Sequence, residues 1–284
     1  MKFTKLHGAG NDFLIVDARG IERDWGRLAV AMCERNFGAG ADGLLLLREP
    51  ANADLRMVLY NADGSEAETS GNGLRCFVKY AVDRGLAKLR DGAITVETLA
   101  GVSRAEANVV DGLVRSVRVS MGRPRLEAQE VPVAIEAAAP LKDVPIDIDG
   151  TRLAVTCVSM GNPHAVEFVS TSVDAYPLET IGPKVERHAL FPARVNFSVA
   201  RVIDAGHIES RTWERGVGET LACGTGASAV MVAARLHGRA GPRVELTQPG
   251  GALVLEWDGE GEVYLTGPAV EVYEGEWPER EPRT

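Results

Sequence analysis

Two short glycine-containing stretches hold the residues best suited to chemistry. SGNG covers residues 70–73 and CGTG covers residues 223–226, and each runs directly into an apolar segment with helical periodicity. A helix start leaves backbone N–H groups without acceptors and carries a partial positive charge, and glycine lets an anion come close to it. Neither stretch contains the lysine of a Walker motif, so a carboxylate is a better candidate ligand than a phosphate. Helix capping alone is the alternative for either stretch taken singly.

Cys223 is the strongest candidate for a catalytic group. It stands just before a helix start, where nearby N–H groups lower the pKa of a thiol and favour the thiolate, which can act as a base. Cys33, Cys76 and Cys157 are expected to be inert core residues, as free cysteines usually are. The four thiols form no C-x-x-C pair and no cluster with histidine, so we expect a reducing compartment and no metal site.

Further polar residues could complete a site around the two loops. Arg215 suits a carboxylate and Glu214 suits an ammonium group, although a surface ion pair would use the same two residues. His164 could act as an acid or base, orient a neighbour, or be purely structural. Five asparagines lie beside glycine or at loop-like junctions, where they could bind a substrate or only form turns. They are Asn11, Asn61, Asn72, Asn162 and Asn196.

The two loops belong to a pattern that occurs twice in the chain. Landmarks in the same order and at nearly constant spacing predict two related halves, and chance similarity between glycine-rich loops is the alternative. We expect a first half at 1–121, with 269–284 packing back on it, and a second half at 122–268. The landmark pairs are Asn11 and Asn162 (151 residues apart), Glu34 and Glu186 (152), and Ser70 and Cys223 (153).

Each half is predicted to be built mainly from short strands. The helix behind the second loop is apolar almost all round and must therefore be surrounded by protein, whereas the helix behind the first shows one apolar stripe. We expect an α/β (α+β) fold in which each half is a curled mixed sheet around a central helix. Alternation and β-branched residues predict strands at 44–47, 56–60, 93–98, 114–121, 152–160, 196–203, 243–248, 252–257 and 262–267.

Other segments are predicted to connect or cover these sheets. A helix should start after Asp24 as N-cap and end before Gly38, with a weaker counterpart interrupted at Gly182-Pro183. Residues 127–145 are rich in alanine and proline and should be irregular. FGAGADG at 37–43 contains G-x-G-x-x-G, but a helix precedes it and a strand follows, so we expect a turn and not a dinucleotide site.

Composition excludes several classes of function. The chain has 284 residues and a formal net charge of -9, with no basic stripe, which argues against binding nucleic acid. No apolar run approaches the roughly 18 residues of a membrane helix, and the N-terminus has no signal-peptide core. We therefore expect a cytoplasmic protein that uses no membrane.

The sequence resembles the diaminopimelate epimerase family. This resemblance implies two mirror-related α/β halves with the active site in a cleft between them, an isomerase without a cofactor, a small amino-acid substrate and a homodimer. The similarity runs through nearly the whole chain in the stretches KLHGAGNDFLIVD, NADGSEAE followed by SGNGLRC, MGNPHAV, RVNFSV and ERGVGETLACGTGASA.

The resemblance also implies residue roles. Inverting a Cα needs a base on one face and an acid on the other, and each half of the family fold supplies one. The implied catalytic residues are Cys223, Ser70, His164 and Glu214, of which His164 and Glu214 match groups beside the two thiols. The implied ligands of the α-carboxylate are the backbone amides of Gly71, Asn72, Gly224 and Thr225. The implied ligands of the α-amino group and the distal end are Asn11, Asn61, Asn162, Asn196, Glu214 and Arg215.

Ser70 is the one departure, because the family usually has cysteine there. Cys76 is retained but lies six residues further on, inside the helix. A serine hydroxyl ionises far less readily than a thiol. Three explanations stay open: a natural substitution with weak or altered turnover, an engineered replacement that traps a complex, and a relative with different chemistry in which Cys223 is the only strong base.

We therefore expect epimerisation of LL-diaminopimelate to meso-diaminopimelate by two-base proton transfer without pyridoxal phosphate, with Ser70 putting the second base in question. Glu214, Arg215 and the asparagines favour a substrate with a second polar amino-acid head. Two alternatives remain at this stage. One is a relative of the proline racemases that isomerises or dehydrates a cyclic amino acid, and the other is a non-catalytic amino-acid-binding protein with the same fold.

Overall fold

The chain forms two compact units in a computed structural model that describes residues 1–68 and 70–278. Unit 1 comprises Met1–Val119 together with the C-terminal segment from Gly267, and unit 2 comprises Ser120–Thr266. The end of the predicted C-terminal segment, residues 279–284, lies outside the described residues. Within the described part of the chain, no helix is both long and apolar enough to cross a membrane.

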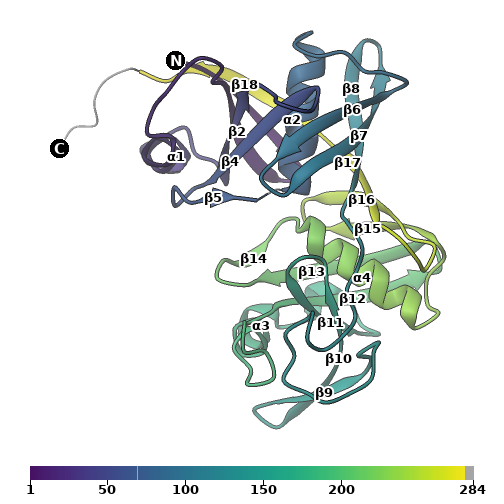
Figure 1. Cartoon of the computed structure of the whole chain (residues 1–284). Coiled ribbons are helices and arrows are strands. Elements are labelled where there is room, and N and C mark those ends of the chain that lie inside the picture. The colour runs from purple at the N-terminus through teal and green to yellow at the C-terminus, as the bar shows by residue number, and fades with distance from the viewer. Residues whose placement is uncertain (69, 279–284) are drawn as a thin grey trace. The chain divides into compact units, whose positions relative to one another are not determined.

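Unit 1 is a mixed sheet with two helices (Figure 1). Its first strand lies between the second strand and the last described strand, so segments from the beginning and the later part of the chain share one sheet. The strands are β1 Lys2–Gly8, β2 Asn11–Asp17, β3 Gly43–Arg48, β4 Leu55–Asn61, β5 Glu66–Ala67, β6 Ala93–Thr98, β7 Gly101–Val110, β8 Leu113–Ser120 and β18 Val270–Glu276; the helices are α1 Trp25–Cys33 and α2 Gly71–Asp83.

Unit 2 has the same kinds of element in the same order, except that its first strand corresponds to the last strand of unit 1. It also contains a short 3-10 helix, η1 Val173–Ala175. The strands are β9 Val144–Ile148, β10 Thr151–Ser159, β11 Pro163–Phe168, β12 Asn196–Asp204, β13 His207–Glu214, β14 Gly218–Thr220, β15 Arg243–Gln248, β16 Gly251–Glu256 and β17 Tyr264–Pro268; the helices are α3 Leu178–Glu186 and α4 Gly224–Leu236.

The strand pairings of the two units match one for one. In unit 1 the parallel pairs are β2 with β3 and β4 with β6; in unit 2 they are β11 with β12 and β13 with β15. The antiparallel pairs also correspond; for example, β1 with β18 in unit 1 corresponds to β10 with β9 in unit 2. The predicted α/β fold with two pseudo-symmetric halves is confirmed, and the duplication extends to the hydrogen-bond pattern of the sheets.

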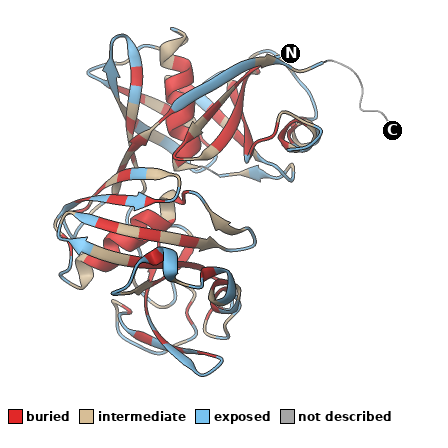
Figure 2. Cartoon of the chain, turned by 180° about the vertical axis from the view of Figure 1, so that it is seen from behind, coloured by how far each residue is buried: buried red, intermediate tan, exposed pale blue. Residues whose placement is uncertain are grey.

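One helix in each unit lies inside the curl of its sheet. α2 packs against β1, β2, β4, β7 and β18, and α4 packs against β10, β11, β12, β13 and β16. Figure 2 shows both helices mostly in the colour of buried residues. The single apolar stripe expected for α2 was too narrow, because Arg75 and Lys79 are buried as well. Lys79 is satisfied by Asp83 at 2.6 Å and by the carbonyl of Val114 at 2.8 Å.

The second helix of each unit covers the outer face of the sheet. α1 starts at the predicted cap, where the Asp24 side chain accepts from the Arg27 N–H, but it ends at Cys33, well before Gly38. α3 continues through Pro183 as a regular helix, so the predicted interruption is wrong. Gly182 serves packing instead: a Cβ there would lie 2.6 Å from Cγ of Trp213, which therefore sits directly against the helix.

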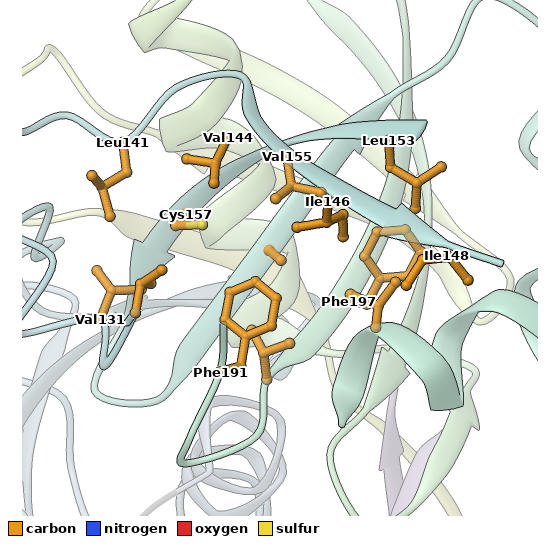
Figure 3. Packing of buried hydrophobic residues seen from close by; sticks show 14 of the residues in the cluster. Val131, Leu141, Val144, Ile146, Ile148, Leu153, Val155, Cys157, Phe191 and Phe197 are labelled. Atoms are coloured by element: carbon orange, nitrogen blue, oxygen red, sulfur yellow. The ribbon is translucent and has the colours of Figure 1, made fainter. Parts of the chain in front are cut away.

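The buried core of unit 2 extends into the segment predicted to be irregular. Residues 127–145 form turns up to the start of β9, yet Val131, Val133 and Leu141 are buried among side chains of β10 and β12. Figure 3 shows Val131 and Leu141 facing Cys157 and Phe191 within this cluster. The segment is irregular in backbone, as predicted, and still contributes to the core.

The glycines at residues 38–43 form the connection between α1 and β3, as expected. The strand that follows, GLLLLR, is buried on both faces because α1 packs on one side of the sheet and α2 on the other. This explains a continuous apolar run where a one-sided strand would alternate.

Candidate active site

The first glycine-containing loop is the N-terminus of α2. Ser70 has an extended backbone and is the N-cap: its Oγ accepts from the Gly73 N–H at 3.1 Å, and its carbonyl accepts the first helical bond from Leu74 at 2.7 Å. The N–H groups of Gly71 and Asn72 precede that bond and so have no acceptor within the helix. They form a short pair of donors at the positive end of the helix dipole.

The second loop repeats this arrangement atom for atom at the start of α4. The Sγ of Cys223 accepts from the Gly226 N–H at 3.3 Å, and the Cys223 carbonyl accepts from the Ala227 N–H at 2.9 Å. The N–H groups of Gly224 and Thr225 precede the first helical bond. Both loops are therefore helix caps, and the capping still leaves two backbone donors in each.

Close approach of neighbouring atoms requires glycine at the fourth position of each loop. A Cβ at Gly226 would lie 2.9 Å from the Thr212 hydroxyl and 3.2 Å from the Cys223 sulfur. At Gly73 it would lie 3.2 Å from Cβ of Ser70. Only a residue without a side chain lets the capping group fold back over the first turn.

In unit 1, two of the predicted asparagines are joined to the Ser70 loop. The buried Asn72 side chain donates to Asn11 at 3.2 Å, and Asn11 donates to Asp42 at 2.5 Å. Asn61 instead lies at the end of β4, where its side chain donates to Ser65 at 3.0 Å within its own turn. The structure thus links Asn11 with Asn72 and places Asn61 in a separate exposed turn.

In unit 2, a chain of hydrogen bonds leads from a histidine to the cysteine. His164 is fully buried on β11, and its Nε2 bonds to Oδ1 of Asn162 at 2.9 Å. The Asn162 amide donates to the Thr225 hydroxyl at 3.3 Å. That hydroxyl lies 3.5 Å from the Cys223 sulfur, to which it can donate. Four predicted site residues are therefore connected in one network.

Glu214 approaches the same sulfur from β13. Its carboxylate accepts from the Thr220 hydroxyl at 2.6 Å and interacts with the thiol of Cys223. Burial raises the pKa of that thiol, the negative charge of Glu214 raises it further, and the hydrogen bonds from Thr225 and Gly226 act in the opposite direction. The helix start was expected to lower this pKa, but burial outweighs it, so the thiol is neutral here.

His164 is neutral as well. Burial lowers its pKa to about 3, and the charge of Arg215 contributes to the shift. A neutral ring that bonds Asn162 through Nε2 must carry its proton there, which leaves Nδ1 as an acceptor without a partner among the described residues. This geometry makes His164 an orienting group for Asn162 in unit 2.

The Glu214-Arg215 turn is held by two further polar groups. The buried Asn196 accepts from the Arg215 N–H at 2.8 Å, and the Arg215 side chain donates to the carbonyl of Ala193 at 2.8 Å. Glu186, only 3% exposed, accepts from Trp213 Nε1 at 2.8 Å and from the Gly216 N–H at 3.1 Å. Together these bonds fix the backbone on both sides of Glu214.

Sequence reasoning missed two of the positioning residues. Glu186 entered only as a landmark of the duplication, and its recurrence at a fixed spacing was the available signal. Gln248 had no local signal: its side chain accepts from the Cys223 N–H at 3.0 Å across 25 positions of the chain. The other three cysteines are buried, with pKa values that burial raises to about 12, in agreement with an inert role.

Comparison with protein families gives one match that covers most of the chain. Residues 3–127 and 156–272 match the model of the diaminopimelate epimerase family. A diaminopimelate epimerase of Acetivibrio thermocellus is 47% identical over 279 residues, which cover 97% of this chain and 98% of that protein. One from Pelotomaculum thermopropionicum is 48% identical over 283 residues, which cover 99% of this chain and all of that one.

Solved structures with the same fold are more distant in sequence. A probable proline racemase from Agrobacterium radiobacter K84, with bound carbonate, superimposes with a TM-score of 0.73 at 18% identity and covers 98% of this chain and 93% of its own. A PhzF-family phenazine biosynthesis protein from Bacillus anthracis has a TM-score of 0.71 at 18% identity, covering 97% and 98%. At these identities the similarity concerns the fold alone.

Proposed function

This chain belongs to the diaminopimelate epimerase family, and from that premise we propose that it inverts one Cα of diaminopimelate with the side chains that cap α2 and α4. It is an isomerase, and its relatives at 43–49% identity carry the name of this activity. The observation that carries the residue assignment is the repeated cap, in which Ser70 and Cys223 occupy the same position beside two free backbone donors.

The free donors of these caps suit the substrate's α-carboxylate. When the Cα–H bond breaks, its electron pair spreads into that carboxylate, so the amides of Gly71, Asn72, Gly224 and Thr225 would face the charge that develops. Donors at helix starts are fixed before the reaction and need not reorganise.

Cys223 is the proposed base for one face of the carbon. Burial and Glu214 keep its thiol neutral, and the substrate's ammonium group would bring positive charge that favours the thiolate. Glu214 interacts with the thiol and can take its proton, while the Thr225 hydroxyl can donate to the thiolate that forms. The thiolate then accepts the Cα proton and becomes a thiol again, while the Ser70 hydroxyl gives its proton to the opposite face. Solvent returns a proton to Ser70 and receives the one that Glu214 holds, which restores the site.

The remaining polar residues are proposed to hold the rest of the substrate. Arg215 is exposed and supplies a guanidinium beside the fixed Glu214 turn, which suits a distal carboxylate. Asn11, Asn61, Asn162 and Asn196 would bind polar groups at either end. A cyclic amino acid such as proline has no second head for these side chains, so the proline-type alternative is not favoured.

The test is solvent-proton exchange at Cα. The full chain is incubated with LL-diaminopimelate in deuterium oxide, and deuterium at Cα and the yield of the meso isomer are measured by mass spectrometry and chiral separation. We expect both in the wild type and neither in Cys223→Ser. Tight binding without exchange would identify a binding protein, and exchange only with hydroxyproline would identify the proline-type alternative.

We further propose a cytoplasmic location and a homodimer. The four buried cysteines form no disulfide, which suits a reducing compartment. Sedimentation of the purified chain would measure its oligomeric state directly.

A further inference from the structure

Arg75, in the second turn of α2, is a buried charge that the proposed chemistry has not used. Its side chain is fully buried, and its Nε donates to the carbonyl of Pro268 at 3.3 Å. Neither Nη1 nor Nη2 has a hydrogen-bond partner among the described residues. Buried arginines normally pair with a carboxylate, because an uncompensated charge in the interior is costly. Such a cost is typically retained where it serves a function.

The guanidinium reaches back toward the loop that starts the helix. Side chains on a helix tilt toward its N-terminus, so a long side chain at 75 covers the turn that contains residues 71 and 72. The surroundings of Gly8 on β1 show where the guanidinium lies. A Cβ at Gly8 would be 2.9 Å from Nη2 of Arg75 and 3.3 Å from the carbonyl of Asn72. The charged group, the first turn of α2 and the glycine therefore meet.

The duplication provides an internal comparison for this residue. The position equivalent to Arg75 in α4 is Ser228, which is also buried and only donates to the Gly224 carbonyl at 2.9 Å. The α4 loop has instead the negative charge of Glu214 beside its cap. The two loops thus have the same backbone, but a positive charge lies near the α2 loop and a negative charge lies near the α4 loop.

The charge on Arg75 is retained at neutral pH. Burial lowers the pKa of its guanidinium to about 10, which still leaves it protonated. A protonated group with free donors behind a helix start adds to the positive potential of the helix dipole. In a region shielded from water, this potential acts strongly on an anion at the loop.

We propose that Arg75 is a positioning residue whose buried charge makes the Gly71–Asn72 loop the stronger carboxylate site of the two. This inference rests on the proposed function, because it assigns to one loop most of the affinity for the α-carboxylate. Arg75 acts from behind the loop, through its field, while the backbone amides make the contact. The loop at Cys223 then binds the same kind of group more weakly and keeps its thiol accessible to protonation.

The first experiment uses acetate as a simple carboxylate probe. The full chain, labelled with nitrogen-15 glycine, is titrated with acetate at constant ionic strength, and the amide resonances of Gly71 and Gly224 are followed. We expect Gly71 to saturate at a lower acetate concentration than Gly224. In Arg75→Met the apparent Kd at Gly71 should rise at least tenfold, whereas Arg75→Lys should stay within threefold because it keeps the charge.

Cys76→Ala is the matched control, since it changes the packing of the same helix turn without changing charge. Thermal unfolding of each variant distinguishes an effect of the lost charge from an effect of a destabilised fold. Because Arg75→Met removes an unpaired buried charge, its Tm should equal or exceed that of the wild type. The proposal is overturned if Arg75→Met binds acetate at Gly71 within twofold of the wild type. It is equally overturned if the Lys and Met variants lose affinity alike while Tm falls, because that would indicate a structural role.

A second arm repeats the measurement with LL-diaminopimelate and records kcat and KM. If the wild type does not exchange the Cα proton of this substrate while the acetate result holds, the proposed function fails and the role of Arg75 stands. If both hold, Arg75→Met should raise KM and lower kcat together, since the carboxylate gains negative charge during proton removal.

Discussion

Cys223 is surrounded by groups that oppose one another at the scale of single residues. Burial and Glu214 favour the neutral thiol, while Thr225 and the Gly226 amide favour the thiolate. Burial has the largest effect, so the side chain is held as a neutral thiol whose pKa a bound ammonium group would lower. This differs from a thiol that is ionised at rest, and it suits a residue that must both accept and return a proton.

Thr225→Val tests this balance with a side chain of the same shape. It removes the hydroxyl that lies 3.5 Å from Sγ and that receives the bond from Asn162. Because the lost donor favours the thiolate, the pKa of Cys223 should rise and the ascending limb of the kcat/KM profile should move to higher pH, with kcat reduced about tenfold at pH 7.

Thr156→Val is the control, since Thr156 is a buried threonine of the same unit that bonds His237 instead. An unshifted pH profile in Thr225→Val would mean that Thr225 does not act on the thiol.

His164 should make the stability of the protein sensitive to acid. Burial lowers its pKa to about 3 from the ordinary 6.5, so between these values only the unfolded chain binds the proton. Stability then decreases as the pH falls below about 6.5, by about 2 kcal/mol between pH 7 and pH 5. In His164→Gln this part of the loss should disappear, as measured by urea unfolding at both pH values. Equal acid sensitivity in the two proteins would contradict the neutral, buried state.

At the scale of elements, α3 acts as the support of the Glu214 turn. Trp213 lies against Gly182 on one side and donates to Glu186 on the other. The helix thus fixes the residue immediately before Glu214, although none of its own side chains is a proposed catalytic group. A tight helix–strand contact of this kind transmits any change in the helix to the site.

Gly182→Ala should therefore affect both stability and activity. Its Cβ would lie 2.6 Å from the indole ring, so Trp213 must move, and we expect a loss of about 1–3 kcal/mol of stability together with a fall in kcat/KM of about tenfold. Gly206→Ala is the control, because the nearest atom to its Cβ would be 3.5 Å away. Unchanged kcat/KM in a destabilised Gly182→Ala protein would show that α3 supports the fold alone.

At the scale of the whole molecule, the sequence indicated two halves and a C-terminal segment that returns to the first half, but not the strand with which that segment pairs. The spacing of Ser70 and Cys223 predicted paired halves, because loops that cap helices keep their glycines. The edge strand β18 beside β1 depends on pairing across the length of the chain, with Phe3 packed under Gly275, and no local pattern encodes such a contact. The positions of β7 and β13 were missed for other reasons: two of the buried positions in β13 are the polar Ser210 and Thr212, and nearly all of β7 is exposed or half-buried.

The candidate site shows the same division between local and distant information. The caps, the glycines and the residues of the Cys223 network were predictable, because each motif is continuous in sequence. The support by Glu186, Gln248 and Arg75 was not, since it depends on which side chains the sheets bring beneath the loops. Burial of Cys223 was also not anticipated, and it reversed the expected direction of the thiol pKa.

The central claim is that positions 70 and 223 act on the same carbon, and Ser70→Cys tests it most directly. The rate of conversion of LL- to meso-diaminopimelate is measured for the wild type, Ser70→Cys, Cys223→Ser and the double variant. We expect the second thiol to raise the rate at least tenfold, because a thiol exchanges protons near neutral pH far better than a hydroxyl, and we expect the gain to vanish when Cys223 is absent. A Ser70→Cys protein no faster than the wild type, or a gain that survives loss of Cys223, would contradict it.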